Sequence, residues 1–91
     1  MLKKYILSND YCIKNVADLT VLINICDNTI IALTDNTSMV LSMFKDKPYS
    51  IQDIFLSFPK KEQTEDCKSG LIELIGMFVS RNILEVYNEI Y

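Results

Sequence analysis

The spacing of apolar residues changes period at Asp35, and this change constrains the fold more than any other feature of the chain. Before it, Thr29–Leu33 is a short β-branched and apolar run, which is typical of a strand. After it, apolar side chains recur at helical spacing, at Val40, Leu41 and Phe44. Residue types that favour helix N-caps lie between the two patterns. The sequence therefore predicts an α+β fold in which a β-rich N-terminal part meets a helical part here.

The residues ahead of Asp35 predict three antiparallel strands joined by tight turns. Asp27 and Asn28 both tolerate positive φ, so they predict a hairpin between the second and third strands. Ala17 and Asp18 predict the preceding turn. The predicted strands are Tyr11–Val16, with Tyr5–Leu7 as a lead-in, then Thr20–Cys26 and Thr29–Leu33.

The register of the second hairpin has two alternatives, which exchange the faces of the third strand. A two-residue turn puts Ile30 and Ala32 on the core face of the second strand. A three-residue turn that includes Thr29 puts Ile31 and Leu33 there instead. We favour the three-residue turn, because Ile31 and Leu33 are the bulkier pair and fill a core better. The core face of the second strand is taken to carry Val21, Ile23 and Ile25.

The chain after Asp35 predicts two short helices. Asp35 or Asn36 is expected to cap the first, which runs to about Phe44. Ser50 is expected to cap the second, and Pro59 ends it. The stripe of the second helix is apolar and comprises Ile51, Ile54, Phe55 and Phe58.

A third and longest helix is predicted from about Glu65 to Arg81. It follows a charged loop over Lys60–Asp66, with Thr64 or Ser69 as its cap. Beyond it, Ile83–Val86 is expected to be a short extended segment or a helix end. The central stripe of the third helix is apolar and comprises Cys67, Leu71, Leu74, Ile75 and Phe78.

The apolar arc of the third helix is wider than one small core requires. Ile72 and Val79 extend it on one flank, beside Lys68 and Gly76. Two interpretations stay open: the C-terminal segment packs on this flank, or the flank lines a groove.

Residues that carry catalytic or metal chemistry are scarce. The 91 residues include no histidine, which excludes His-based acid–base pairs, nucleophile–His arrangements and His metal ligands. The only glycines are Gly70 and Gly76, so no glycine-rich phosphate loop is possible. Cys12, Cys26 and Cys67 show no CxxC spacing. We predict a protein that is not an enzyme and that carries no cofactor and no metal.

The length and net charge of the chain restrict its domain number and its possible partners. The length predicts one domain over residues 1–91. The net charge of −3 gives no long-range attraction for nucleic acid or anionic lipid. No run approaches the length of a signal peptide or a membrane span, and the odd, sparse cysteines fit a reducing compartment, so we expect a cytoplasmic protein.

The third predicted strand is expected at an open edge of the sheet. Its unpaired N–H and C=O groups would invite pairing, and no lysine or proline guards Thr29–Leu33. An extended peptide can add there as a further strand. The alternatives are that the N-terminal segment covers the edge or that a second copy does.

The chain from Asp10 to Val86 resembles the PqqD-like family, the precursor-peptide recognition elements of ribosomally made, post-translationally modified peptides. Thr34 and Thr37 stand where the family usually has Asn and Ala, and no Gly follows Asp46. The matching segments are Ile30-Ile31-Ala32-Leu33-Thr34-Asp35-Asn36-Thr37, Val40-Leu41 with Phe44, Lys45-Asp46, Ser50-Ile51-Gln52-Asp53-Ile54 and Asn82-Ile83-Leu84-Glu85.

The resemblance implies a winged helix-turn-helix-like module and a function. Family members bind the leader of a precursor peptide as a strand added to the third strand, against the third helix, and present it to a modifying enzyme. That enzyme would be a leader peptidase and cyclase, a radical S-adenosylmethionine enzyme or a cyclodehydratase. The implied peptide-binding residues are Asn28, Thr29, Ile30, Ile31, Ala32, Leu33, Lys68, Leu71, Ile72, Ile75 and Val79.

The same order of elements also occurs in winged-helix DNA-binding regulators, the alternative function. Such a regulator needs a basic recognition helix. Here Lys68 and Arg81 are offset by Glu65, Asp66 and Glu73, so we expect no binding to nucleic acid.

Overall fold

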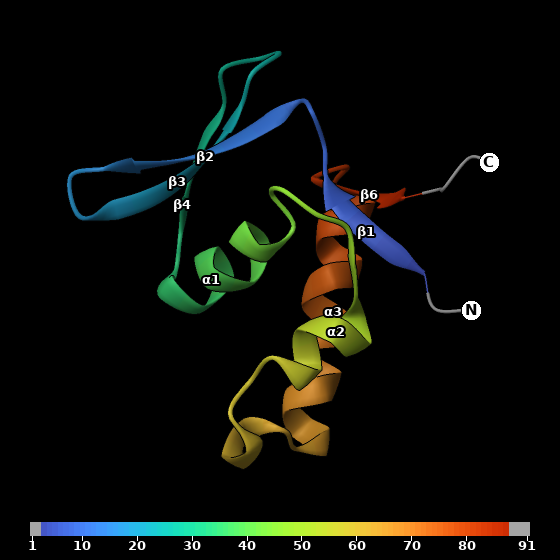
Figure 1. The fold of residues 1–91 in the computed structure, drawn as a ribbon. Helices are drawn as coiled ribbons and strands as arrows, with labels where there is room; N and C mark the ends of the chain where they lie inside the picture. The colour runs from blue at the N-terminus through green and yellow to red at the C-terminus, as the bar shows by residue number, and fades with distance from the viewer. Residues whose placement is uncertain (1–2, 88–91) are drawn as a thin grey trace.

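A three-stranded antiparallel sheet precedes the helices, as predicted. The computed structural model describes residues 3–87. Within them, the sheet has the order β2-β3-β4, and it lies over one side of the helices (Figure 1). Its strands are β2 (Tyr11–Val16), β3 (Leu19–Asn24) and β4 (Ile30–Leu33). The helices that follow are α1 (Asp35–Met43), α2 (Ile51–Leu56) and α3 (Glu65–Ser80).

A second antiparallel sheet, in the order β5-β1-β6, was not predicted. The expected lead-in is a separate strand that pairs with the segment after α3, residue Lys4 opposite Tyr87 and Leu7 opposite Leu84. The C-terminal segment is therefore a strand rather than a helix end. The strands of this sheet are β1 (Lys4–Leu7), β5 (Tyr49–Ser50) and β6 (Leu84–Tyr87).

The turn between β3 and β4 is longer than either predicted turn. The Asn24 N–H donates to the Thr29 carbonyl at 2.8 Å, which leaves the four residues Ile25–Asn28 in the turn. Asn28 has a φ of 61°, and its N–H donates to the Asn24 carbonyl at 2.8 Å. The Asn24 carboxamide oxygen accepts the Cys26 N–H at 2.9 Å. The local hydrogen bonds of Asn24 therefore decide the turn length.

The favoured register is consequently wrong. Leu22 lies opposite Ile31, and Val21 lies opposite Ala32. Ile30 and Ala32 thus share the face of Val21, as the rejected alternative had it. The reason is that a four-residue turn keeps the parity of a two-residue turn, and parity alone decides which side chains share a face.

The main core cluster lies on the other face of β3 from the one expected, although Val21 on the expected face is also buried, at 7% exposure. Leu22 is fully buried, and Leu33 packs against the core from the same side of the sheet. The prediction that Leu33 faces the core, made because Leu33 is bulky, is therefore correct. The prediction that Leu33 shares a face with Val21 is wrong, because Leu33 shares the face of Leu22. The buried core consists of Leu22, Val40, Leu41, Phe44, Ile54, Leu71, Ile75, Phe78, Ile83 and Leu84.

Short-range caps begin each helix. Thr34, one residue before the predicted cap, accepts the Thr37 N–H on its hydroxyl at 3.3 Å. Ser50 caps α2, as predicted, and Thr64, one of the two predicted candidates, caps α3. Between α2 and α3, the expected loop contains a 3₁₀ turn, η1 (Lys60–Glu62).

The end of α3 directs the chain into β6. Asn82 adopts a φ of 62°, and the Ile83 N–H donates to the Phe78 carbonyl at 2.9 Å. The Asn82 N–H donates to the Val79 carbonyl at 3.1 Å, which completes a Schellman motif. Ile83 is buried directly after the reversal, so the motif fixes the start of the second sheet.

Candidate functional site

The free edge of β4 is the first candidate feature. In the sheet order β2-β3-β4, β4 pairs only with β3 among the strands of residues 3–87. The Asn24 N–H donates to the Thr29 carbonyl, so this position lies in phase with the hydrogen-bonded pairs, which alternate along an antiparallel ladder. The next such pairs are formed by Ile31 and Leu33 with β3. Ile30 and Ala32 therefore direct their N–H and C=O groups away from β3.

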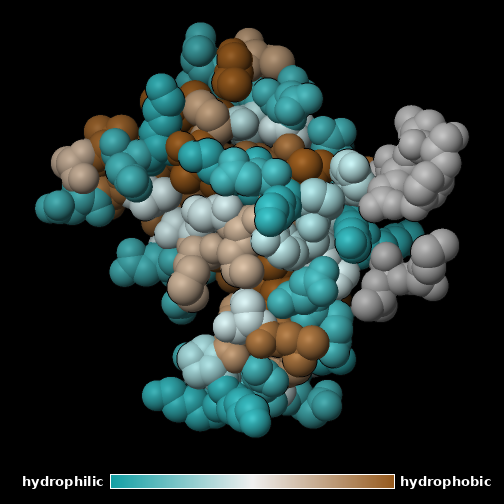
Figure 2. All heavy atoms as spheres, in the orientation of Figure 1, coloured by the Kyte–Doolittle hydropathy of each residue, from teal (hydrophilic) through white to brown (hydrophobic). Residues whose placement is uncertain are grey.

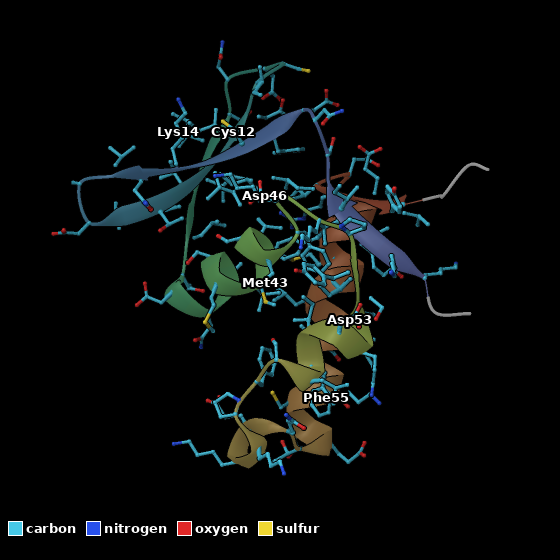
Figure 3. The ribbon with its side chains drawn as sticks, viewed as in Figure 1. Cys12, Lys14, Met43, Asp46, Asp53 and Phe55 are labelled. Carbon is cyan, nitrogen blue, oxygen red and sulfur yellow. The ribbon has the colours of Figure 1, made fainter. Side chains whose placement is uncertain are left out.

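Apolar side chains flank this edge on both faces of the sheet. Ile30 is 64% exposed and Ala32 is exposed on the outer face, whereas Ile31 is 39% exposed on the inner face. Figure 3 shows Cys12 and Lys14 of β2 projecting from the outer face, away from α1. No charged residue or proline lies within Ile30–Leu33, so nothing in the strand itself opposes pairing.

The N-terminal segment does not cover β4. Its strand β1 pairs with β5 on one side and with β6 on the other. The predicted alternative that the N-terminal segment covers the edge of the third strand is therefore wrong for residues 3–87.

An apolar groove between α1 and α3 is the second candidate feature. Its volume is about 390 Å³, which falls in the range of cavities that accept ligands. α1 contributes Met39, which is 57% exposed, and Asn36 from its first turn. The remaining lining comes from α1, α3 and the segment between α2 and α3: Val40, Phe58, Lys61, Glu62, Thr64, Cys67, Gly70, Leu71 and Leu74.

Gly70 keeps this groove open. A Cβ built on Gly70 would meet no atom within 4 Å, so the space above the helix backbone is empty. Gly76 is equally unobstructed, but it does not line the groove.

The predicted residues of α3 are spread over several environments. Leu71 and Ile75 are 4% and 1% exposed, so they belong to the core, although Leu71 also forms the floor of the groove. The Lys68 ammonium lies 5.6 Å from the centre of the Phe55 ring, which Figure 3 shows on α2. Val79 lines a separate hollow beside β6.

Ile72 is the one predicted α3 residue with a largely free side chain, at 48% exposure. At about 100° per residue, Ile72, Lys68 and Val79 share one flank of α3, and Gly70 and Leu74 lie on the opposite flank. The predicted residues Ile30–Leu33 therefore lie together on β4. The predicted flank of α3, which carries Lys68, Ile72 and Val79, does not line the groove between α1 and α3.

The sequence analysis did not assign these residues of the groove to a binding site: Asn36, Met39, Phe58, Gly70 and Leu74. Two signals could have found them. A glycine in the middle of a long helix lowers helix stability, so its presence indicates a packing or functional role. An exposed methionine is also an adaptable contact for an apolar partner.

Nothing in residues 3–87 forms an evident reactive centre. The exposed Cys26 thiol donates to the Asp10 carboxylate at 3.5 Å, and this hydrogen bond, aided by the negative charge, raises the pKa of Cys26 above its ordinary value. A raised pKa keeps the thiol protonated and weakly nucleophilic. Among these residues, no group of three or more Cys, Asp or Glu side chains is placed to hold a metal ion. None of the helices there is long and apolar enough to cross a membrane.

Comparison with known proteins gives a likeness of structure. The sequence matches no protein-family model and no curated protein. A solved structure of TbiB1 in complex with the TbiA(beta) leader peptide is similar to this chain, with a TM-score of 0.72 and 15% sequence identity. The match covers 92% of this chain and 99% of the other. The chain therefore has the α+β, winged helix-turn-helix-like fold of TbiB1. The pairing of β1 with β5 and β6 is the part of the fold that was not predicted.

Proposed function

We propose that this protein is a binding module for the leader segment of a ribosomal precursor peptide. The leader adds as an antiparallel strand to the free edge of β4. The observation that carries the proposal is that Ile30 and Ala32 offer unpaired backbone groups there, on a fold shared with a protein solved with a leader peptide. β-Strand addition supplies affinity through main-chain hydrogen bonds.

The edge alone does not account for useful affinity. Ile30 and Ala32 each present one N–H and one C=O, and each hydrogen bond contributes about 1 kcal/mol net. A micromolar complex requires about 8 kcal/mol, beyond the entropy lost when a flexible peptide is ordered. Complete burial of one large apolar side chain contributes roughly 1.5–3 kcal/mol. The leader therefore needs an apolar anchor, and the groove between α1 and α3 is lined to accept one.

The path of the protein chain from β4 into α1 determines on which side of the leader's strand segment the anchor residue lies. β4 ends at Leu33, and Asn36 at the start of α1 already lines the groove. In an antiparallel arrangement, the peptide residues that precede the added strand pass this end of β4. The anchor residue therefore lies N-terminal to the strand segment of the leader.

The module itself is non-catalytic and presents the bound leader to a separate modifying enzyme. The raised pKa of Cys26 and the absence of histidine support the proposal that catalysis takes place on a separate enzyme. The resemblance to PqqD-like modules suggests three enzyme types for the partner: a leader peptidase and cyclase, a radical S-adenosylmethionine enzyme or a cyclodehydratase.

Titration with the leader of a ribosomal precursor peptide tests the proposal. Amide hydrogen exchange by NMR should show that binding protects the N–H groups of Ile30 and Ala32. The N–H groups of Ile31 and Leu33 should be protected with and without the peptide, because they face β3. The variant Ala32→Pro removes one outward donor and should weaken binding by about tenfold.

Thermal unfolding of Ala32→Pro is the control, since proline is tolerated at an edge when its missing N–H faces outward. Tight binding of the leader without new protection at Ile30 and Ala32 would show that the peptide lies elsewhere.

A further inference from the structure

We propose that Asp27 is a specificity-determining residue of the β4 edge, and that it selects leader peptides in which a Lys or Arg follows the strand segment. The inference rests on the proposed function, because a peptide must add to β4 before its charge can be selected. Its experiment compares peptides that differ only in charge. Strand addition and charge selection are therefore measured separately.

Asp27 lies in the turn directly before β4. Its Oδ1 atom accepts the Thr29 N–H at 2.9 Å, and Thr29 is the residue that precedes the strand. The Asp27 side chain is exposed, and Figure 2 shows hydrophilic residues beside apolar ones at the tip of this turn, at the top of the view. The hydrogen bond therefore holds a solvent-accessible negative charge at one end of the free edge.

The charge of Asp27 is not neutralised by the protein. Hydrogen bonds from Thr29 lower the pKa of Asp27 below its ordinary value, and no lysine or arginine of residues 3–87 is among the groups that shift it. The Cys26 thiol donates to the Asp10 carboxylate, which raises the pKa of Cys26, and the negative charges of Asp10 and Asp27 raise it further. This end of the edge therefore carries negative charge that a cation of the peptide would complement.

The opposite end of β4 offers less selection by charge. Asp35 lies in the first turn of α1, where the helix N-terminus already stabilises a carboxylate. Lys61 and Glu62 both line the groove between α1 and α3, so their opposite charges offset each other there. The preference for a cation therefore falls on the turn that carries Asp27.

The direction of the added strand decides which side of the leader carries the cation. In an antiparallel arrangement, leader residues before the strand segment pass Leu33, and residues after it pass Asp27. Lys and Arg have long side chains that can approach an exposed carboxylate beyond the paired residues. The leader that fits therefore has an apolar anchor, then an extended segment, and then a basic residue.

Synthetic peptides test this selection. Each peptide has one Phe as the anchor, a spacer of one of several lengths, a segment of Val and Thr, and a following position with Arg, Gln or Glu. At about 20 mM salt, the Arg peptide should bind roughly two- to fivefold more tightly than the Gln peptide, as exposed ion pairs allow, and the Glu peptide should bind most weakly. At about 0.5 M salt, the three affinities should converge. Calorimetric titration measures affinity, and amide exchange at Ile30 and Ala32 shows whether the peptide occupies the edge.

Asp27→Asn removes the charge but keeps an oxygen that can accept the Thr29 N–H. This variant should bind the Gln peptide within about twofold of the wild-type protein and lose the preference for Arg. Asp18→Asn is the matched control, because Asp18 is an exposed carboxylate in the turn between β2 and β3, at the other end of β3 (Figure 1). It removes the same charge and should keep the preference.

Each outcome decides one of the two proposals. Equal affinity of the Arg and Glu peptides for the wild-type protein, with protection at Ile30 and Ala32, overturns charge selection and leaves strand addition intact. This comparison stands even if Asp27→Asn does not fold. Loss of the preference in Asp18→Asn as well would show an effect of net charge and overturn the role of Asp27. If no peptide protects Ile30 and Ala32 at up to about 1 mM, both proposals fail.

Discussion

Single residues with positive φ fix where this chain reverses direction. Ala17, Asn28 and Asn82 have φ values of 56°, 61° and 62°. Asparagine adopts this region at low cost, and Asn28 was recognisable in the sequence for that reason. Asn82 belonged to the segment that resembles PqqD-like modules, but its role becomes clear only with the hydrogen bond from Ile83 to Phe78. The sequence shows which residues tolerate a reversal, and the packing of Ile83 selects the position.

A reciprocal pair of hydrogen bonds begins α2. The Asp53 carboxylate accepts the Ser50 N–H at 3.0 Å, and the Ser50 hydroxyl accepts the Asp53 N–H at 3.1 Å. Hydrogen bonds from the Ser50 backbone, and then from its hydroxyl, lower the pKa of Asp53 below its ordinary value. The folded state therefore favours the charged carboxylate.

This pair makes stability depend on acid pH. Because the folded pKa is lowered, the stabilisation is fully present above the unfolded pKa of about 4 and is lost as pH falls through the folded pKa. We expect the unfolding temperature of the wild-type protein to drop more than that of Asp53→Asn between about pH 5 and pH 2. Thermal unfolding monitored by circular dichroism at several pH values measures this. Parallel pH profiles for the two proteins would exclude the role of Asp53.

At the scale of elements, α3 serves two purposes on different flanks. One flank packs toward α2, where Lys68 lies over Phe55, and the other lines the groove with α1. The wide apolar arc in the sequence indicated that α3 does more than cover a core, but it did not show which flank faces a groove. The position of α1 decides this.

Three variants of α3 distinguish the flanks. Gly70→Leu should fill the groove and reduce leader affinity by about tenfold or more, while leucine raises helix stability by up to about 1 kcal/mol. Gly76→Leu gains the same helix propensity outside the groove and should bind normally. Ile72→Asp changes an exposed side chain on the flank opposite the groove, and this variant should fold and bind nearly as well as the wild-type protein. Calorimetric titration and thermal unfolding measure both quantities.

The variant Ile72→Asp can contradict this assignment in two ways. If it folds but loses the leader, the originally predicted flank is the binding wall and the groove is not. If it unfolds the domain, the Ile72 side chain supports packing that its 48% exposure does not reveal.

At the scale of the whole molecule, charge argues against the DNA-binding alternative. The net charge is −3, and the first turn of α3 carries Glu65 and Asp66. Lys68, a cation that could contact phosphate, lies over Phe55 instead. A basic recognition helix supplies most of the affinity in DNA-binding relatives of this fold class.

We expect no specific complex with duplex DNA at about physiological salt, where specific Kd values usually lie near 10⁻⁸–10⁻¹¹ M. Fluorescence anisotropy with a mixed set of labelled duplexes is the measurement. Saturable binding in that range, which survives competitor DNA, would favour the regulator over the peptide-binding module.

The sequence by itself determined what depends on neighbours a few residues away. The change of period at Asp35, the cap at Ser50 and the three helices could be read from it, because helical hydrogen bonds and caps close within about four residues. For the same reason the cap of α3 was narrowed to Thr64 or Ser69, and the structure has Thr64. The open edge of the third predicted strand was accessible for a similar reason, since Ile30–Leu33 leads directly into α1.

Only the tertiary structure decided what depends on distant partners. The sheet β5-β1-β6 joins Lys4 to Tyr87, and no local pattern specifies that pairing. The register of β4 depended on one turn whose length Asn24 sets, and a change of one residue would exchange the faces of Ile30 and Ile31. The groove formed where α1 passes Gly70, because a cavity belongs to the space between elements rather than to any one segment of the chain.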